Sequence, residues 1–266
     1  MPTLIVSATA CVCYLLATGL QLQSILRGRH SAGLIKGLAA VAIICHGFAT
    51  YSGFVGEGRG YDLGLYPMLS LMALTIVAMV LLSSLRRPLD NLFLVIFPIA
   101  IITILMDLVF AGDYTPRGQM TSGILSHIVL SVIAYSILTI AAVQAVLLSF
   151  GDTLLRHHQI VVLRNMPPLE TMEQLMFEML WGGLLFLTLS IVSGFVFLEN
   201  LSGPGLVHHT VITLAAWLVF IVLLWGRHKL GWRGAIASRW ALAGFILLAL
   251  GYFGSKLVLE VILGRA

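Results

Sequence analysis

The residues best suited to chemistry in this sequence are its histidines, of which there are eight. Four of them stand beside arginine or lysine in short hydrophilic breaks, where solvated side chains are expected: His30, His157, His158 and His228. The other four lie in or at the ends of long apolar stretches: His46, His127, His208 and His209. An imidazole in an apolar environment is costly without a partner, so the second group contains the candidate functional residues. Neutral imidazole is a common ligand of metals, including haem iron.

Helical spacing arranges these candidates on faces. In the stretch 122–150, the face led by His127 continues through Ser131, Ala134, Tyr135, Leu138 and Ala142. In the stretch 206–226, the face led by His209 continues through Thr213, Ala216, Trp217 and Phe220. His208 is rotated by about 100° from His209 and cannot share its face. Two such faces are able to enclose a flat apolar ligand. The alternative, in which each histidine only hydrogen-bonds a neighbouring helix or sits at the membrane interface, stays open.

The composition indicates what kind of chain positions these residues. Of 266 residues, 59% are apolar and 10% are charged, whereas a typical soluble domain carries ~25% charged residues. Mean hydropathy is +1.03. These values exclude a soluble globular enzyme, a disordered chain and a nucleic-acid-binding domain, and a net charge of +4 spread over loops forms no basic patch. The three cysteines, Cys11, Cys13 and Cys45, form no CxxC pair and are predicted to be small buried residues.

Apolar runs long enough to cross a bilayer recur along the whole chain. A spanning helix needs about 20 apolar residues, and no gap between the runs is long enough for a soluble domain. The sequence therefore predicts an all-α fold, a polytopic membrane helix bundle with eight transmembrane helices, in a single integral membrane domain over 1–266. The predicted spans are 3–26, 32–55, 62–85, 89–111, 122–150, 174–199, 206–226 and 236–262.

Lysine and arginine fall unequally on the two sides of this bundle. Eleven are assigned to one side: Arg27, Arg29, Lys36, Arg86, Arg87, Arg156, Arg164, Arg227, Lys229, Arg233 and Arg239. Four are assigned to the other: Arg59, Arg117, Lys256 and Arg265. Because cytoplasmic loops carry the excess of cations, the first side is predicted to be cytoplasmic and both termini to lie outside. His46, His127 and at least one of the adjacent pair His208 and His209 are then expected near the same depth in the outer leaflet.

Other polar residues carry weaker signals. The stretch 151–170 is equally compatible with a short interfacial helix and with an irregular loop. Lys256 and Glu260, four residues apart on one helix, are expected to pair with each other. Glu178 needs a partner that the sequence does not identify. The chain has no Ser/His/Asp set, no paired carboxylates and no glycine-rich phosphate loop, so we expect a protein that is not an enzyme.

Three segments of the second half resemble the cytochrome c assembly family, whose members handle haem in membranes. They are HIVLSVIAYSILTIAAVQAVLL (127–148), MPPLETMEQLMFEMLWGGLLFLTLSIVSG (166–194) and WGRHKLGWRGAIASRWALAGFILLALGYFGSK (225–256). The first is similar to the family's histidine-led helix, the second to its LP-x-LE-x-LD-x-L linker with the helix that follows, and the third to its GWRG loop and the helix ending in YFG. The resemblance is strongest over 122–262, and His127 matches the family's first periplasmic histidine.

The sequence departs from haem-exporting members of that family at two places. Their tryptophan-rich periplasmic loop, WGxxWxWD, has no counterpart in ENLSGPGLVHHTV, which contains no tryptophan and no aspartate. Their second periplasmic histidine has no counterpart in SKLVLEVILGRA. The pattern looks most like the YpjD/HemX-like subgroup of inner-membrane proteins. This resemblance implies a haem-related membrane function, but not transfer of haem to apocytochrome.

We therefore expect a non-enzymatic, haem-binding or haem-handling protein of the bacterial inner membrane, related to cytochrome c assembly, with both termini periplasmic. His127 and His209 are the expected axial ligands, His46 is a further candidate, and Tyr135 and Trp217 are expected pocket walls. The expected partners are haem, membrane lipid and other proteins of cytochrome assembly or haem synthesis, but not nucleic acid. Two alternatives stay open: a cofactor-free structural or regulatory protein with a HemX-like effect on haem synthesis, and a small-solute transporter.

Overall fold

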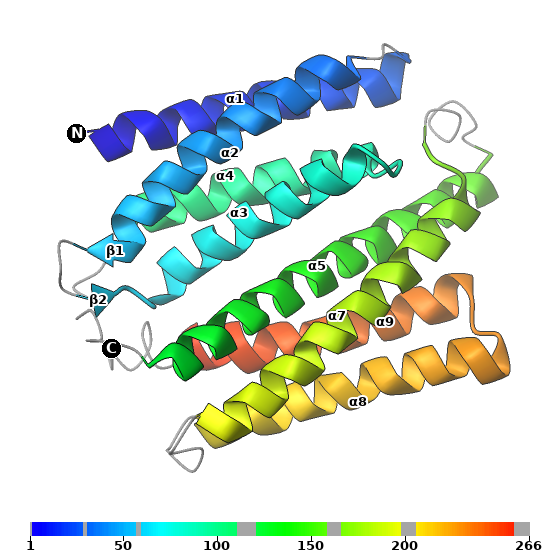
Figure 1. The fold of residues 1–266 in the computed structure, drawn as a ribbon. Helices are drawn as coiled ribbons and strands as arrows, with labels where there is room; N and C mark the ends of the chain where they lie inside the picture. The colour runs from blue at the N-terminus through cyan, green and yellow to red at the C-terminus, as the bar shows by residue number, and fades with distance from the viewer. Residues whose placement is uncertain are drawn as a thin grey trace. The chain divides into compact units, whose positions relative to one another are not determined.

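The computed structural model describes residues 2–28, 31–56, 60–110, 121–158, 166–197 and 206–257 (Figure 1). Its long helices are α1 (Pro2–Arg27), α2 (Ala32–Phe54), α3 (Leu65–Ser84), α4 (Phe93–Val109), α5 (Ser122–Arg156), α7 (Leu169–Phe197), α8 (Leu206–Leu230) and α9 (Gly234–Ala249). The short elements are the antiparallel strands β1 (Val55–Gly56) and β2 (Gly60–Tyr61), the 3-10 turn η1 (Asp90–Leu92) and the π-helical turn η2 (Leu250–Gly254). Within these ranges, eight helical segments are long and apolar enough to cross a membrane, which confirms the predicted fold class.

The chain divides into two compact units, each described here by itself. The first unit comprises Met1–Gln119 and Leu154–Pro167, and the second comprises Met120–Thr153 and Pro168–Ala266. Helices α1 to α4 therefore belong to the first unit, whereas most of α5 and all of α7, α8 and α9 belong to the second. The single integral domain over 1–266 stays a prediction.

The first unit is a closed ring of four helices. Helix α1 packs on α2 and α4, and α3 packs on the same two helices. In its core, the ring of Phe97 from α4 stacks on the ring of Tyr14 from α1, with centroids 5.4 Å apart. At one end, the Lys36 ammonium lies 3.1 Å from a carboxylate oxygen of Asp90 and donates to the Ser84 carbonyl at 2.7 Å. A single cation thus joins α2 to the connection between α3 and α4.

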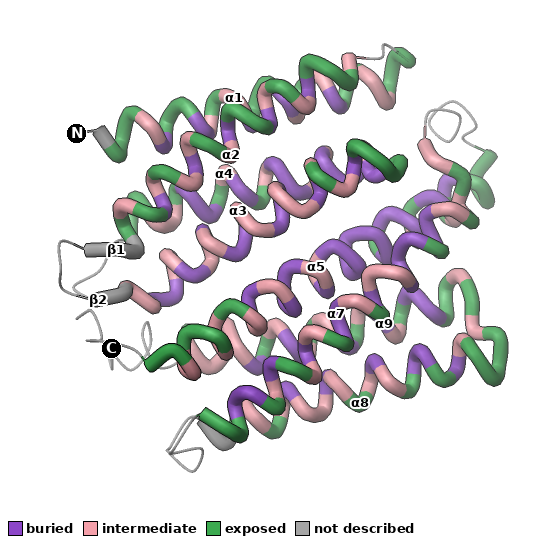
Figure 2. Tube along the Cα trace, in the orientation of Figure 1, coloured by how far each residue is buried: buried purple, intermediate pink, exposed green. Residues whose placement is uncertain are grey.

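In the second unit, α8 packs against both α7 and α9, and side chains of α5 contact α7 and α9. Helix α5 is buried mainly through its middle (Figure 2), and residues 141–145 are buried in succession. Since successive residues point about 100° apart, every side of α5 is covered there. Gly183 of α7 permits a close approach to α5, because a Cβ at that position would lie 2.6 Å from the Leu138 side chain.

Two helix ends differ from those predicted. Helix α5 continues to Arg156 instead of ending at 150, and α7 begins at Leu169 instead of 174. Pro167 and Pro168 precede α7 and account for its start, because proline lacks the N–H that an earlier helical turn would need. The two ends of the stretch 151–170 therefore belong to α5 and α7. Residues 159–165 lie outside the described residues, so the predicted interfacial helix stays a prediction.

Helix α9 ends in the π-helical turn η2, where the sequence predicts a regular span over 236–262. Just before this turn, the Leu248 carbonyl accepts a hydrogen bond from the Tyr135 hydroxyl of α5 at 3.1 Å. A side chain inserted into the i→i−4 ladder of backbone hydrogen bonds is a known cause of such irregularity. The turn places Tyr252 and Phe253 against Tyr135, with ring centroids 5.6 and 6.2 Å from that of Tyr135.

Candidate functional site

His127 lies near the start of α5, and its ring reaches across to α7. Its Nδ1 atom is 2.9 Å from the Ser190 carbonyl oxygen and 3.0 Å from the Ser193 hydroxyl. A carbonyl oxygen only accepts hydrogen bonds, so Nδ1 carries the proton and donates it to Ser190. The neutral ring therefore keeps its lone pair on Nε2. Fixing one ring nitrogen as a donor to a carbonyl is how proteins orient histidines that bind metals through the other nitrogen.

Serine hydroxyls hold this part of α5 and α7 together. The Ser131 hydroxyl donates to the His127 carbonyl at 2.8 Å and lies 2.7 Å from the Ser190 hydroxyl. The Ser193 hydroxyl donates to the Ser190 carbonyl at 2.8 Å. The imidazole of His127 is thus held by a hydrogen-bonded group that spans both helices, and its orientation does not depend on one contact.

His209 lies at the same end of the second unit, because α5 and α8 both begin there (Figure 1). Its ring meets Tyr252 edge to face, with centroids 6.0 Å apart. Among the residues that the structure describes, neither ring nitrogen of His209 has a hydrogen-bond partner. His127 and His209 are near enough to interact electrostatically, and their role as a pair of ligands stays a prediction. His208 is exposed, whereas His209 is half-buried, so the two adjacent side chains lie in different environments.

We call this region the histidine end of the second unit. It comprises the start of α5, the end of α7, the start of α8 and the last turns of α9 with η2, within the ranges 121–135, 186–197, 206–216 and 246–257. The two predicted pocket walls are fixed by their own hydrogen bonds. Tyr135 donates to the Leu248 carbonyl, and the Trp217 indole N–H donates to the Thr188 hydroxyl at 2.9 Å. Their roles as walls of a pocket stay predictions.

His46, the third histidine candidate, belongs to the first unit and has both ring nitrogens occupied. It is completely buried, with Nε2 3.0 Å from the Ser70 hydroxyl and Nδ1 3.5 Å from the Tyr14 hydroxyl. The Thr50 hydroxyl extends this group, 3.4 Å from that of Ser70. A neutral imidazole offers one donor and one acceptor, and both are engaged here. Metal binding by His46 would first break one of these hydrogen bonds, so its part in a site stays a prediction.

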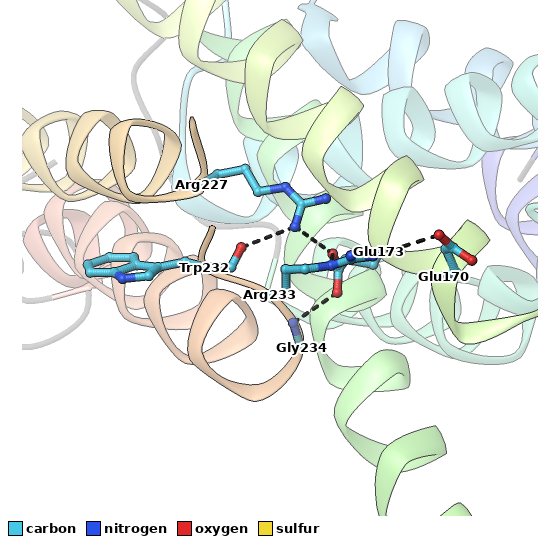
Figure 3. A network of polar contacts seen from close by, with 6 residues as sticks. All are labelled: Glu170, Glu173, Arg227, Trp232, Arg233 and Gly234. Atoms are coloured by element: carbon cyan, nitrogen blue, oxygen red, sulfur yellow. Dashed lines mark hydrogen bonds and ion pairs between the residues drawn. The ribbon is translucent and has the colours of Figure 1, made fainter. Parts of the chain in front are cut away.

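A buried carboxylate occupies the opposite end of the second unit (Figure 3). Glu173 of α7 is 7% exposed, and its Oε1 accepts from Arg227 at 2.9 Å and from Arg233 at 3.1 Å. Its Oε2 accepts from the backbone N–H of Gly234 at 2.9 Å. Arg227 also donates to the Trp232 carbonyl at 3.2 Å. We call this group of five residues the carboxylate end, and it joins α7 to both arms of the α8–α9 hairpin.

The carboxylate end has a clear structural role. Helix α9 begins at Gly234, and its N-cap residue Arg233 makes no side-chain capping bond. The first N–H groups of a helix lack partners within the helix, and a negative charge there is favourable. Glu173 supplies that acceptor and that charge from another helix. Gly231 and Gly234 have φ angles of +66° and +53°, so the tight connection between α8 and α9 favours glycine at both positions.

Two imidazoles without a third ligand suit one class of metal centre. No group of three or more His, Cys, Asp or Glu side chains able to hold a metal ion is found in the described part of the chain. A structural or catalytic zinc site uses at least three protein ligands. Haem iron takes its equatorial ligands from the porphyrin and needs only axial ligands from the protein. Together with the aromatic rings of Tyr135, Tyr252 and Phe253, the histidine end therefore fits haem better than a bare metal ion.

Sequence reasoning did not identify several residues of these two ends. Ser190 and Ser193 are three residues apart in an otherwise apolar span and hence share a face, a signal that could have found them. Tyr252 stands in the YFG segment, but a π-helical turn at that point has no sequence signature. Glu173, just before the predicted span 174–199, has no sequence signal of this kind. Its partner Arg233 is 60 residues away, and no spacing rule connects two such positions.

The comparisons with known proteins assign the chain to a family. The model of the family described as Cytochrome C assembly protein matches residues 3–263. The chain belongs to the cytochrome c assembly family. This member is 32% identical, over 225 residues, to the inner membrane protein YpjD of Escherichia coli K12, a match that covers 84% of this chain and 86% of YpjD. No solved structure gives a significant match to it.

A second relative is less completely covered. It is an uncharacterized 28.8 kDa protein in the nifR3-like 5' region of Azospirillum brasilense, 32% identical over 141 residues and 52% of each chain. The family match and the similarity to YpjD confirm the resemblance seen in the sequence. Membership of the cytochrome c assembly family supports a haem-related role in cytochrome biogenesis at the level of the family. YpjD is an inner membrane protein, in keeping with the eight apolar helices of this chain.

Proposed function

We propose that this protein binds haem at the histidine end of the second unit, with His127 and His209 as axial ligands. It would handle haem during cytochrome assembly without being an enzyme, in contact with other proteins of cytochrome assembly or haem synthesis. The observation that carries the proposal is the state of His127. Its Nδ1 proton is donated to the Ser190 carbonyl, and this leaves the Nε2 lone pair for a metal.

Five residues of the histidine end have a definite part in this proposal. His127 and His209 would hold the haem iron. When bound, haem itself would be the redox-active or transferable group. Ser190 and Ser193 keep the His127 ring in one tautomer and one orientation. Tyr252 packs its ring against those of His209 and Tyr135.

The orientation of the protein in the membrane is part of the proposal. Among the described residues of the second unit, Arg227, Lys229, Arg233 and Arg239 lie at or near the carboxylate end, which we therefore assign to the cytoplasm. The histidine end and both termini would then face the periplasm of the inner membrane. A reporter enzyme that is active only outside the cytoplasm, fused to the C-terminus, should be active. An inactive fusion, with a cytoplasm-specific reporter active instead, would reverse the assignment.

A haem titration tests the proposal directly. The protein, purified in mild detergent, should take up haem with a Soret band typical of histidine ligation. His127→Ala and His209→Ala should each remove most of that absorbance. His208→Ala is the matched control, because it removes an exposed imidazole from the neighbouring position of the same helix.

Three outcomes would count against this assignment. If His208→Ala abolishes the Soret band while His209→Ala leaves it intact, the ligand on α8 is wrongly chosen. If both ligand variants bind haem as the wild type does, the haem lies elsewhere. If the wild type takes up no haem, the contact between His209 and Tyr252 is ordinary core packing, and a cofactor-free structural or regulatory role replaces the haem proposal.

A further inference from the structure

All three cysteines of this chain belong to the first unit. Cys11 and Cys13 lie on α1 and Cys45 lies on α2. Each has a free thiol and is half-buried, so the prediction of fully buried cysteine side chains is wrong. The filling of a core by small residues therefore does not account for these three positions, and the chemistry of their thiols becomes relevant.

The side of α2 that carries Cys45 faces α1. Helix α2 packs on both α1 and α3. His46 is completely buried in the core of the unit, and the residues on either side of it in the chain are each rotated from it by about 100°, in opposite directions. One of them, Gly47, faces α3, because a Cβ at that position would lie 3.7 Å from the Leu74 side chain. The other, Cys45, therefore lies on the flank that packs on α1.

Cys13 of α1 lies at the same level and on the same side as Cys45. The residues that follow them, Tyr14 and His46, meet across the core, with the Tyr14 hydroxyl 3.5 Å from Nδ1 of His46. Helices α1 and α2 are antiparallel neighbours (Figure 1), and in such a pair the residues that precede two facing residues point to the same side. The two thiols are near enough to interact electrostatically. Cys11 points about 200° away from Cys13 and cannot replace it.

The packing of α1 on α2 suits a covalent link between them. The two Cα atoms of a disulfide usually lie within about 7 Å of each other, so the helices that it joins must approach closely. Small residues permit such an approach. Both helices carry alanines that are completely buried: Ala10, Ala17, Ala39 and Ala42. A disulfide between Cys13 and Cys45 therefore needs little movement of either helix.

The surroundings of the two thiols determine which oxidant can reach them. Cys13 lies near the middle of α1 and Cys45 near the middle of α2, both far from the ends of apolar spans. The adjacent side chains of Val12 and Ile44 are exposed, so lipid borders this part of the interface. Charged oxidants such as glutathione disulfide are excluded from hydrocarbon at this depth. Quinones dissolve in the bilayer, and a relay that ends in quinone keeps protein thiols of the bacterial periplasm oxidised.

We propose that Cys13 and Cys45 form a redox-active thiol pair, which a membrane quinone oxidises to a disulfide between α1 and α2. In this step two S–H bonds break and one S–S bond forms. Two electrons and two protons pass to the quinone, whose two carbonyl oxygens become the hydroxyl groups of the hydroquinone. The inference goes beyond the proposed function and is independent of it, because the proposed haem ligands belong to the second unit.

The experiment counts free thiols after oxidation in the absence of oxygen. Full-length protein in mild detergent is incubated with decylubiquinone, whose fully substituted ring does not alkylate thiols, and is then denatured and treated with a thiol reagent. The wild type should fall from three reactive thiols per chain to one, with one hydroquinone formed per disulfide. Cys13→Ser and Cys45→Ser should each keep both remaining thiols. Cys11→Ser is the matched control and should lose both of its thiols.

A peptide map of the oxidised wild type identifies the pair without any variant. A peptide from α1 linked to one from α2 through Cys13 and Cys45, two hydrogens lighter than the separate peptides, supports the inference. Diamide, a general thiol oxidant, separates geometry from oxidant. Three thiols left after both treatments would show that the pair does not close, and closure with diamide alone would exclude quinone as the oxidant. A disulfide through Cys11, or between two chains on a non-reducing gel, would assign a different pair. Each of these three results overturns the inference and leaves the haem proposal untouched.

Discussion

At the carboxylate end of the second unit, both oxygens of Glu173 accept hydrogen bonds, whereas at the histidine end the Nε2 atom of His127 has no partner among the described residues. Both ends belong to the same four helices, and both place polar groups in an apolar bundle. The difference lies in how many of the hydrogen-bond donors and acceptors at each end have partners within the protein. A group whose donors and acceptors all pair internally stabilises the fold. A group that leaves one acceptor unpaired keeps the capacity to bind something else.

The first unit provides an independent case of the same contrast. His46 is the same residue type as His127 and is also in an apolar span, but Ser70 and Tyr14 engage both of its ring nitrogens. The hydrogen-bonding capacity of the His46 ring is therefore fully used without a ligand. A histidine in an apolar helix is thus not sufficient to indicate a site, and the number of ring nitrogens that the protein itself occupies separates the two situations.

The largest expected effect follows from breaking the carboxylate end. Glu173→Leu removes the acceptor shared by Arg227, Arg233 and the N–H of Gly234. Leaving these donors without their acceptor should lower the free energy of unfolding by about 3 kcal/mol, the low end for breaking a buried ion pair, since Arg233 is largely exposed. Denaturant unfolding in detergent measures this loss.

Glu170 provides the control for this substitution. Its side chain is 86% exposed and lies 3.7 Å from Arg233, so Glu170→Gln should change stability by less than about 0.5 kcal/mol. The protein that remains folded after Glu173→Leu should still bind haem as the wild type does. An unchanged unfolding free energy, or a loss of haem affinity in the folded fraction, would mean that the two ends are not separate in function.

His46→Ala should have the next largest effect, and on stability alone. The substitution leaves a cavity in the core of the first unit and removes the ring that joins the Tyr14 and Ser70 hydroxyls. We expect a loss of about 3 kcal/mol or slightly less, because Thr50 can take over part of the bonding to Ser70. The Soret absorbance per folded molecule should stay at the wild-type level. Its disappearance would instead make His46 a ligand.

Much of the fold could be predicted from sequence because membrane spans leave a simple signal. Backbone groups in a bilayer must pair within a helix, so long apolar runs report spans directly. The eight predicted spans correspond to eight helices in the structure. The errors in the prediction fall at the ends of helices, because apolar composition does not determine where a helix ends. Helix α5 extends six residues past its predicted end, into the stretch 151–170 that the sequence left open between a short interfacial helix and an irregular loop.

The candidate site could be predicted only in part, for a physical reason. The positions of His127 and His209 at one end follow from counting helices, and the separation of His208 from the face of His209 follows from helical rotation. Their partners do not follow, because hydrogen bonds between helices depend on the rotation and depth of each helix. The bond from Tyr135 to the Leu248 carbonyl spans 113 residues and coincides with a π-helical turn that no periodicity predicts.

A smaller effect is expected where α5 and α7 meet between the two ends. A Cβ at Gly183 would lie 2.6 Å from both Cγ and Cδ2 of Leu138, so the whole buried leucine side chain would have to move. Gly183→Ala should therefore lower the free energy of unfolding by about 2 kcal/mol. The adjacent Gly182 is the matched control, because a Cβ there meets only Ile137 at an ordinary 3.9 Å.

The two substitutions are expected to change stability in different directions. Gly182→Ala should be neutral or stabilising by up to about 1 kcal/mol, since alanine favours the helix over glycine. Thermal unfolding of the two variants in the same detergent should thus move in opposite directions or differ clearly in size. Equal losses would mean that helix flexibility, and not the contact with Leu138, explains the glycine pair.

The smallest effect should come from the group that orients His127. Ser193→Ala removes one of the two oxygens near Nδ1, but the Ser190 carbonyl still accepts the proton and keeps the tautomer. Haem affinity should fall only about threefold, as expected for the loss of a secondary hydrogen bond. Ser131→Ala is the matched control, because that hydroxyl bonds the His127 backbone and Ser190 but does not touch the ring. If both variants weaken haem equally in a Soret titration, the serines act by holding α5 to α7. If only Ser193→Ala weakens haem binding, the Ser193 hydroxyl acts on the imidazole of His127 itself. The difference between His46, with both ring nitrogens hydrogen-bonded, and His127, with only one, then depends on the hydrogen bonds of Nδ1.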